Sequence, residues 1–296
     1  MNLLIILASL VSLASPNGKF AAQFAQTQDK PFLTTYTLTY EGDTVVAPSR
    51  LGLNLDNRCW EMALGMRTLP QYESWMDPME WDSVSAPVTR DGYTAATIYL
   101  SRKPEQPAAP STPMGNARLA DKDGLVRSNY RLNIEVRLYD EGLAFRYFFP
   151  EHPAAIFHKV VADETTYALP AGTMVYAEQW AQAGFEHIPF EQISAPVEMP
   201  LLCHRGNLWS AILTADVDDW CHSKLRIQNS KLTTEMYSPV DLVTYFATPW
   251  KIIMAARTPG AILEKSVAMV DGLNPEPQGD FSWVKPGKIM RETTSH

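Results

Sequence analysis

The chain has 296 residues, 46% of them hydrophobic and 20% charged, which excludes a wholly disordered or collagen-like protein. Its formal charge of −8 comes without any basic stripe, which argues against nucleic acid as a partner. No apolar run reaches the roughly 18 residues of a membrane-spanning helix, and the three cysteines Cys59, Cys203 and Cys221 are too few for a disulfide framework.

The N-terminus begins with an apolar run over residues 3–8 that looks like the central part of a signal peptide. A basic segment before the run is missing, and the apolar pattern continues through residues 11–14. We therefore interpret residues 1–9 as a possible signal-peptide remnant, with a buried first strand as the alternative.

Alternation of polar and apolar residues with period two dominates the chain and predicts strands. Residues 36–40 and 44–46 flank a turn, and residues 130–138 and 143–148 flank another, so each pair predicts a hairpin. Two further strands are predicted at 242–246 and 250–255. The fold class predicted is mainly β, a large antiparallel β-sandwich with few short helices.

One short helix is predicted to begin at Pro259, with Thr258 as its N-cap. The 22 prolines scattered along the chain argue against long helices. Pro104, Pro107 and the prolines after them recur every third residue, which suits a polyproline II ligand for a partner or, as we favour, an extended surface loop.

Two Cys-His dipeptides, Cys203-His204 and Cys221-His222, raise the possibility of a zinc site. Adjacent residues of a strand face opposite sides, so both members of a dipeptide would not reach one ion. Ordinary buried cysteines are the favoured interpretation.

Residues 72–82 combine aromatic rings with carboxylates, a pairing typical of sugar sites because a ring stacks on a sugar face while carboxylates accept hydroxyl hydrogen bonds. A loop with its rings tucked inward is the favoured alternative. The residues concerned are Trp75 and Trp81 with Glu73, Asp77, Glu80 and Asp82.

Residues 179–191 contain Trp180 and two carboxylates, Glu186 and Glu191, each of which is a competent oxygen ligand for Ca²⁺. Exposed charge is the alternative. No nucleophile elbow, P-loop, dinucleotide-binding glycine pattern or HExxH motif occurs, so the chain shows no complete catalytic site of its own.

The order of several short motifs is more specific than any one of them. From about residue 10 to residue 292, the series resembles the N-terminal domain of glycoside hydrolase family 97, the bacterial α-glucosidase and α-galactosidase family. The motifs are SPNGK (15–19), LTYEGDTVV (38–46), PSRLGL (48–53), RLYDEGLAFRY (137–147), TPWK (248–251), LNP (273–275) and WVKPGKIMRE (283–292).

The resemblance implies a mutarotase-like β-super-sandwich that precedes a (β/α)₈ catalytic barrel, on which all catalytic carboxylates lie. It divides the chain into residues 1–9, a sandwich domain over 10–273, and a linker with the start of a missing barrel over 274–296. It also implies an α-linked oligosaccharide substrate, a barrel of the same full-length protein as partner, and a periplasmic or secreted location. One departure is that residues 103–107 stand where family members often have a Trp-Gly-Glu stretch.

The resemblance further implies calcium, because in calcium-dependent members a glutamate of this domain helps barrel glutamates bind the ion. By spacing from the strand at 173–176, that glutamate matches Glu186, with Glu191 as the fallback. One carboxylate holds Ca²⁺ poorly, so the isolated chain is expected to bind it weakly.

Two other interpretations remain. The chain is a stand-alone sandwich that binds carbohydrate through Trp75, Trp81 or Trp180, or it is an inactive truncated fragment. Residues 286–292 resemble a barrel-entry sequence, which favours the domain or the fragment, and an exposed apolar face at a docking surface would agree.

Overall fold

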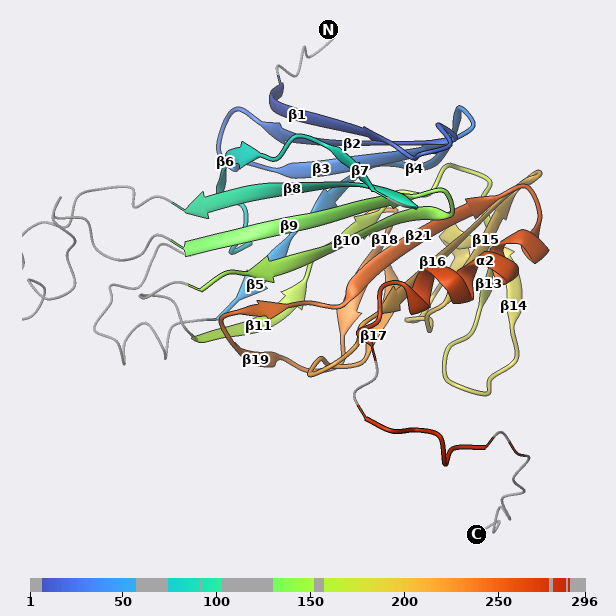
Figure 1. The fold of residues 1–296 in the computed structure, drawn as a ribbon. Coiled ribbons are helices and arrows are strands. Elements are labelled where there is room, and N and C mark those ends of the chain that lie inside the picture. Colours follow the sequence, from blue (N-terminus) through green and yellow to red (C-terminus); the bar gives the residue numbers. More distant parts are fainter. Residues whose placement is uncertain are drawn as a thin grey trace, which may run out of the picture.

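Two layers of antiparallel strands form the body of the protein (Figure 1). A computed structural model describes residues 7–56, 74–90, 92–102, 130–151, 157–276, 279–285 and 287. The predicted fold class is confirmed, since these residues form a mainly-β sandwich.

The first layer is one large sheet with an 11-stranded pairing network. Two short strands pair at its side, β20 (Phe246–Ala247) with β10 and β7 (Val88–Arg90) with β8. Its main path runs in the order β14 (Glu186–Pro189), β13 (Met174–Ala177), β15 (Leu201–Arg205), β16 (Leu208–Ala215), β21 (Trp250–Ala256), β10 (Gly142–Phe149), β9 (Tyr130–Tyr139), β8 (Tyr93–Arg102) and β6 (Glu80–Val84).

The second layer consists of three smaller sheets. They are β1 (Leu7–Ala14), β2 (Phe20–Thr27), β3 (Thr34–Tyr40) and β4 (Asp43–Leu51); β19 (Val240–Val243), β11 (Phe157–Asp163) and β5 (Leu53–Leu55); and β12 (Thr166–Tyr167), β18 (Lys231–Met236) and β17 (Ser223–Gln228).

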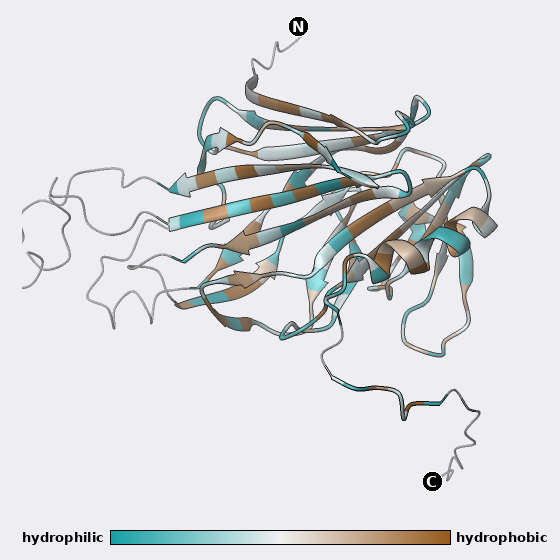
Figure 2. Cartoon of the chain, viewed as in Figure 1, coloured by the Kyte–Doolittle hydropathy of each residue, from teal (hydrophilic) through white to brown (hydrophobic). Residues whose placement is uncertain are grey.

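The core lies between the layers and follows the alternating pattern of the strands (Figure 2). In β9 the apolar residues Leu132, Ile134 and Val136 are buried, while the polar residues between them face the other side. Tyr36 of β3 meets Phe145 of β10 with 5.2 Å between ring centroids, so the two layers contact directly.

Both predicted hairpins are present, as β3–β4 and β9–β10. The second begins its return strand at Gly142, where a Cβ would lie 2.3 Å from the carbonyl oxygen of Ile253 in β21. Only glycine lets β21 approach so closely, which explains the Asp-Glu-Gly turn.

The helix α2 (Pro259–Asp271) begins where predicted and runs longer than the short helix expected. The side chain of Thr258 caps it by accepting a hydrogen bond from the Ala261 amide at 3.2 Å. Its buried residues Ile262 and Met269 cover the outer face of the large sheet, beside Trp250.

The predicted strand over residues 242–246 is wrong as a single element. β19 ends at Val243 and β20 begins at Phe246, because Tyr245 between them takes a left-handed backbone with φ of 51°. β19 pairs with β11 and β20 with β10, so this segment crosses from one layer to the other.

At the N-terminus, residues 7–9 belong to β1 and pair with β2, while residues 1–6 lie outside the described residues. The signal-peptide interpretation of residues 1–9 therefore stays a prediction. The proline series over 104–113, residues 103–107, Cys59 and Glu73 also lie outside the described residues. Within the part of the chain that the structure describes, no helix is long and apolar enough to cross a membrane.

After α2 the chain leaves the sandwich (Figure 1). The Asn274 side chain accepts a hydrogen bond from the Asp216 amide at 2.7 Å, which ties the start of this segment to the end of β16. Phe281, Trp283 and Val284 beyond it are exposed.

Candidate functional site

The two predicted calcium ligands lie on the edge of the large sheet. Glu186 opens β14 opposite Ala177 of β13, and Glu191 lies in the 3₁₀ turn η1 (Phe190–Gln192) that follows. Both are exposed. Among the described residues, no group of three or more His, Cys, Asp or Glu side chains converges as a metal site. Glu186 is thus compatible with giving one ligand to a shared ion but not with holding Ca²⁺ alone.

Of the sugar-stacking candidates, Trp75 is buried in the core with 5% of its surface exposed. Its ring meets Tyr130 edge-on at 5.5 Å and His158 at 5.8 Å, so no face is open to a sugar. Trp81 is half-buried, and its indole N–H donates to Thr34 Oγ1 at 3.0 Å. Both tryptophans therefore agree with the alternative of rings tucked inward.

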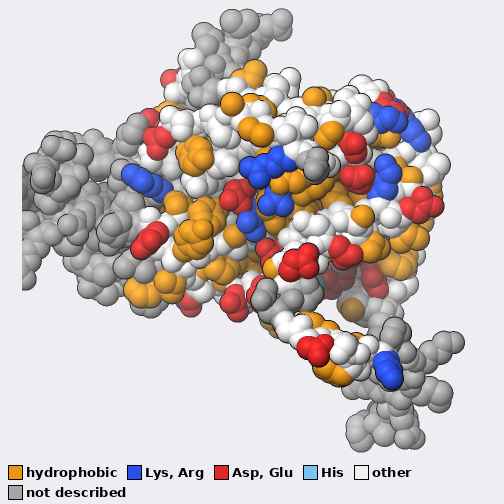
Figure 3. Space-filling model, in the orientation of Figure 1, with side chains coloured by type: hydrophobic (Ala, Val, Ile, Leu, Met, Phe, Trp, Pro, Cys, Tyr) orange, Lys and Arg blue, Asp and Glu red, His pale blue; other side chains and the backbone are white. Residues whose placement is uncertain are grey.

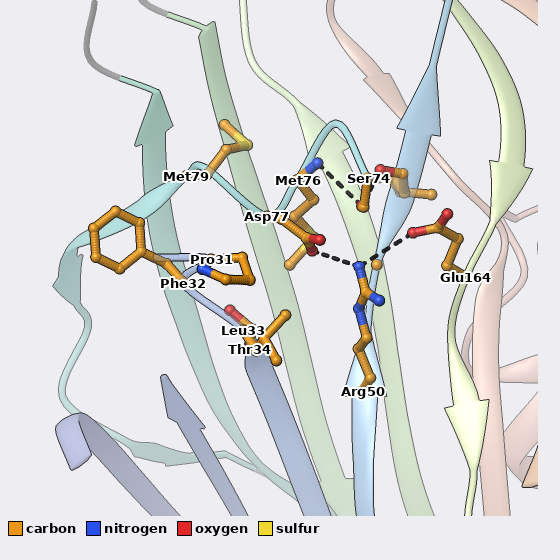
Figure 4. A network of polar contacts seen from close by, with 12 residues as sticks. Pro31, Phe32, Leu33, Thr34, Arg50, Ser74, Met76, Asp77, Met79 and Glu164 are labelled. Atoms are coloured by element: carbon orange, nitrogen blue, oxygen red, sulfur yellow. Dashed lines mark hydrogen bonds and ion pairs between the residues drawn. The ribbon is translucent and has the colours of Figure 1, made fainter. Parts of the chain in front are cut away.

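The carboxylates of the same segment are also used within the fold (Figure 4). Arg50 of β4 pairs with Asp77 and, at 3.3 Å, with Glu164. Burial raises the pKa of Glu164, although the Ser74 hydroxyl and the Arg50 guanidinium oppose this. Asp82 accepts a hydrogen bond from the Ser101 hydroxyl at 2.7 Å. The ion pairs of Arg50 join β4 to the two connecting segments that carry Asp77 and Glu164, so these carboxylates stabilise the fold.

The Cys-His dipeptides do not assemble a zinc site. Cys203 faces the core, and burial raises the pKa of its thiol to about 12. His204 projects to the outer face, where Trp209 lies opposite it. The thiol and the imidazole therefore point apart, as alternation along a strand requires.

A hollow of about 350 Å³ opens beside the connection between β13 and β14. Its walls come from three parts of the chain: the β13–β14 connection, the segment before β15, and the hairpin of β17 and β18. The lining residues are Gln179, Trp180, Ala195, Pro196, His222, Lys224, Glu235, Met236 and Tyr237.

A carboxylate beside this hollow positions two of its lining residues. Glu198 pairs with His222 Nε2 at 2.8 Å and with Lys224 Nζ at 2.9 Å. Lys224 Nζ also donates to the carbonyl of Gln179 at 2.7 Å. Burial of Glu198 works against ionisation, but Lys224 and His222 outweigh it and lower its pKa.

The lowered pKa of Glu198 predicts a contribution to stability that is present above the unfolded pKa of about 4.3 and is lost as pH falls through the folded value. We expect E198Q to destabilise the chain by about 1.5–3 kcal/mol at pH 7, because charge-assisted hydrogen bonds are lost. The deficit should shrink as pH falls through the lowered, folded pKa of Glu198. Urea unfolding from pH 7 to 3 tests this, with E191Q as the exposed control, and a deficit of constant size would contradict it.

A second hollow of about 150 Å³ shares His222 with the first. The buried ion pair between Lys251 Nζ and Asp163 Oδ2, 2.7 Å apart, forms part of its lining. Trp220, Cys221 and other residues complete the wall.

Two exposed aromatic side chains, Trp180 and Tyr237, line the first hollow. Trp180 is 62% exposed and Tyr237 84% exposed, and Phe185 is also exposed in the β13–β14 connection. Of these, only Trp180 was singled out in the sequence. Glu198, Lys224 and Tyr237 were missed, because no local motif marks residues that long-range strand pairing brings together.

The opposite, helix-bearing side of the large sheet looks different. Basic side chains gather near the middle of the face, with acidic ones around them (Figure 3). Arg137 and Arg146 lie over the Trp250 ring at 4.7 and 4.3 Å, and Arg146 pairs with Glu135 and Asp216. These arginines are therefore held by intramolecular contacts.

The fold and site together define a β-sandwich domain with two exposed aromatic residues in one hollow and, among its described residues, no group of three or more metal-ligating side chains. Residues 13–275 match the family model described as glycosyl-hydrolase 97 N-terminal. The chain belongs to the N-terminal domain family of glycoside hydrolase family 97.

Solved structures agree with this assignment at the level of the fold. A glycoside hydrolase family 97 enzyme from Pseudoalteromonas sp. strain K8 is similar with a TM-score of 0.70 and 15% identity, covering 94% of this chain and 40% of the enzyme. Other structures of that enzyme hold acarbose or panose. A beta-arabinopyranosidase is similar with a TM-score of 0.59 and 16% identity, over 83% of this chain and 40% of that one. No curated protein matches the sequence.

The chain thus spans about 40% of the length of these enzymes. The sequence-based assignment to the family is confirmed.

Proposed function

We propose that this chain serves as the N-terminal sandwich of an α-glycosidase, an α-glucosidase or α-galactosidase, and completes the active site of a catalytic barrel. The single observation that carries this is the family match over residues 13–275 combined with 40% coverage of the similar enzymes. The substrate is an α-linked oligosaccharide, in keeping with the acarbose and panose bound by the Pseudoalteromonas enzyme.

The docking end in this proposal is the one that bears the β13–β14 connection. Trp180 and Phe185 project there without cover, and an exposed aromatic pair is typical of a surface that another domain buries. Glu186 follows in the same segment. Docking of this end would bring Glu186 to the barrel.

Calcium is the cofactor of this proposal. Glu186 would supply one carboxylate, and ligands of the barrel would supply the rest, so that the calcium site is complete only in the docked state. In such a site the residues of this chain would help to bind the ion and to orient the two domains. Hydrolysis uses paired carboxylates that flank the glycosidic bond, and these belong to the barrel.

The test uses the complete product of the encoding locus, read beyond the codon for His296. We expect E186Q to lower kcat/KM on an α-glycoside by roughly 10- to 100-fold and to raise the calcium concentration needed for activity. The matched variant E191Q, a few residues away and equally exposed, should keep wild-type activity.

One outcome would overturn this proposal, and a second would reassign its calcium ligand. A reading frame that stops directly after His296 removes the barrel. Full activity and calcium response in E186Q, with loss in E191Q, would move the ligand role from Glu186 to Glu191.

A second candidate function is a stand-alone carbohydrate-binding sandwich. The hollow with Trp180 on one wall and Tyr237 on another favours it, because exposed rings beside polar groups suit a sugar. Calorimetric titration of the chain with panose separates the two functions, since only the binding module should bind it without a barrel.

A further inference from the structure

Four rings from four neighbouring strands cluster on the face of the large sheet that also bears α2. They belong to His187 of β14, Tyr176 of β13, His204 of β15 and Trp209 of β16. Tyr176 is the register partner of His187, and Trp209 that of His204. The ring centroids of these two pairs are 4.5 and 4.7 Å apart, with planes within 16° and 25°. Each imidazole is therefore held in place by an aromatic neighbour.

The two imidazoles meet edge to edge between these neighbours. His187 Nε2 lies 2.8 Å from His204 Nε2, while the ring centroids are 5.1 Å apart and the planes differ by 22°. With the nitrogens so much closer than the centroids, the rings point their Nε2 atoms at each other. One of these atoms donates a proton and the other accepts it, so the accepting ring is neutral in this contact.

We propose that the His187–His204 pair is a binding site for one divalent transition-metal ion of the Ni²⁺, Cu²⁺ or Zn²⁺ class. Neutral imidazole is a preferred ligand of these ions, and water completes the coordination. A neutral ring that donates from Nε2 moves its proton to Nδ1, so both Nε2 lone pairs become available and no proton is released overall.

The geometry favours ions with ligands at right angles. Two nitrogens at about 2.1 Å from such an ion are about 3 Å apart, and around a tetrahedral Zn²⁺ about 3.4 Å. The observed 2.8 Å needs a small rotation of the rings for Ni²⁺ or Cu²⁺ and a larger one for Zn²⁺. His187 is exposed, so water can reach the ion.

Binding would have a structural consequence. β14 is the edge strand of the large sheet, and the ion would link it to β15 across β13. This link would hold the end of the connection that presents Trp180 and Phe185. Glu186 and His187 are consecutive in β14 and project to opposite sides, so the inference does not depend on the calcium proposal.

The test uses the untagged chain after treatment with a chelator. Calorimetric titration with NiCl₂ should show one ion per chain, and H187N and H204N should each weaken the affinity roughly tenfold or more. H222N is the matched control, because His222 is an exposed imidazole that pairs with Glu198 instead. It should keep nearly wild-type affinity, and CaCl₂ should give no signal that depends on His187 or His204.

A second readout uses the wild-type chain alone. Saturating Ni²⁺ should slow backbone amide exchange in β14, because the edge strand gains a link to β15. Either of two results would overturn the proposal: no binding at millimolar Ni²⁺, or unchanged affinity in the H187N/H204N double variant.

Discussion

K251M is expected to destabilise the chain by about 3–5 kcal/mol, because it leaves the Asp163 carboxylate charged and buried without its partner. The two side chains are only 6% and 3% exposed, and their 2.7 Å contact joins β21 of the large sheet to β11 of the other layer. The Lys251 ammonium also lies 4.9 Å from the centre of the Tyr147 ring. Urea denaturation at pH 7 measures the loss.

The double variant K251M/D163N serves as the control for this prediction. It removes both charges, so it should lose less stability than K251M alone, since no uncompensated ion remains in the interior. A K251M chain within about 1 kcal/mol of the wild type would contradict the account of a buried, mutually dependent pair.

W75A is the second change with a large expected effect. Removing this buried indole from its contacts with Tyr130, Phe149 and His158 should cost about 3–5 kcal/mol. Thermal or urea unfolding reports the loss, and W75F should recover part of it because a smaller ring still fills some of the space.

W180A is the matched control, since Trp180 is the same residue type and 62% exposed. Its stability should stay within about 0.5 kcal/mol of the wild type. Equal losses in W75A and W180A would contradict the division between a core tryptophan and a surface tryptophan.

The strands of the sandwich were largely predictable because their signal is local. The β9–β10 hairpin has alternating residues on both sides of a glycine turn, and α2 has a cap and a proline at its start. The break at Tyr245 was not predictable, because residues 242–246 are all good strand formers and only the crossing between layers interrupts them.

The candidate site was less predictable, for a physical reason. Trp75 and Trp180 both stand among carboxylates in the sequence, yet a partner far along the chain, Tyr130, decides that Trp75 is core. The Glu198 cluster and the Lys251–Asp163 pair likewise depend on strands that meet only in the folded chain. Glu186 was found through the family resemblance, and its role as a calcium ligand remains a prediction.

If this sandwich serves as one domain of a glycosidase, as we propose, it should not bind the sugar by itself. The most direct measurement is calorimetric titration of the chain with panose, with W180A and Y237A in parallel. We expect no binding below millimolar concentrations and no difference between the variants. Micromolar binding by the wild type that W180A or Y237A abolishes would contradict it and would establish a stand-alone carbohydrate-binding module.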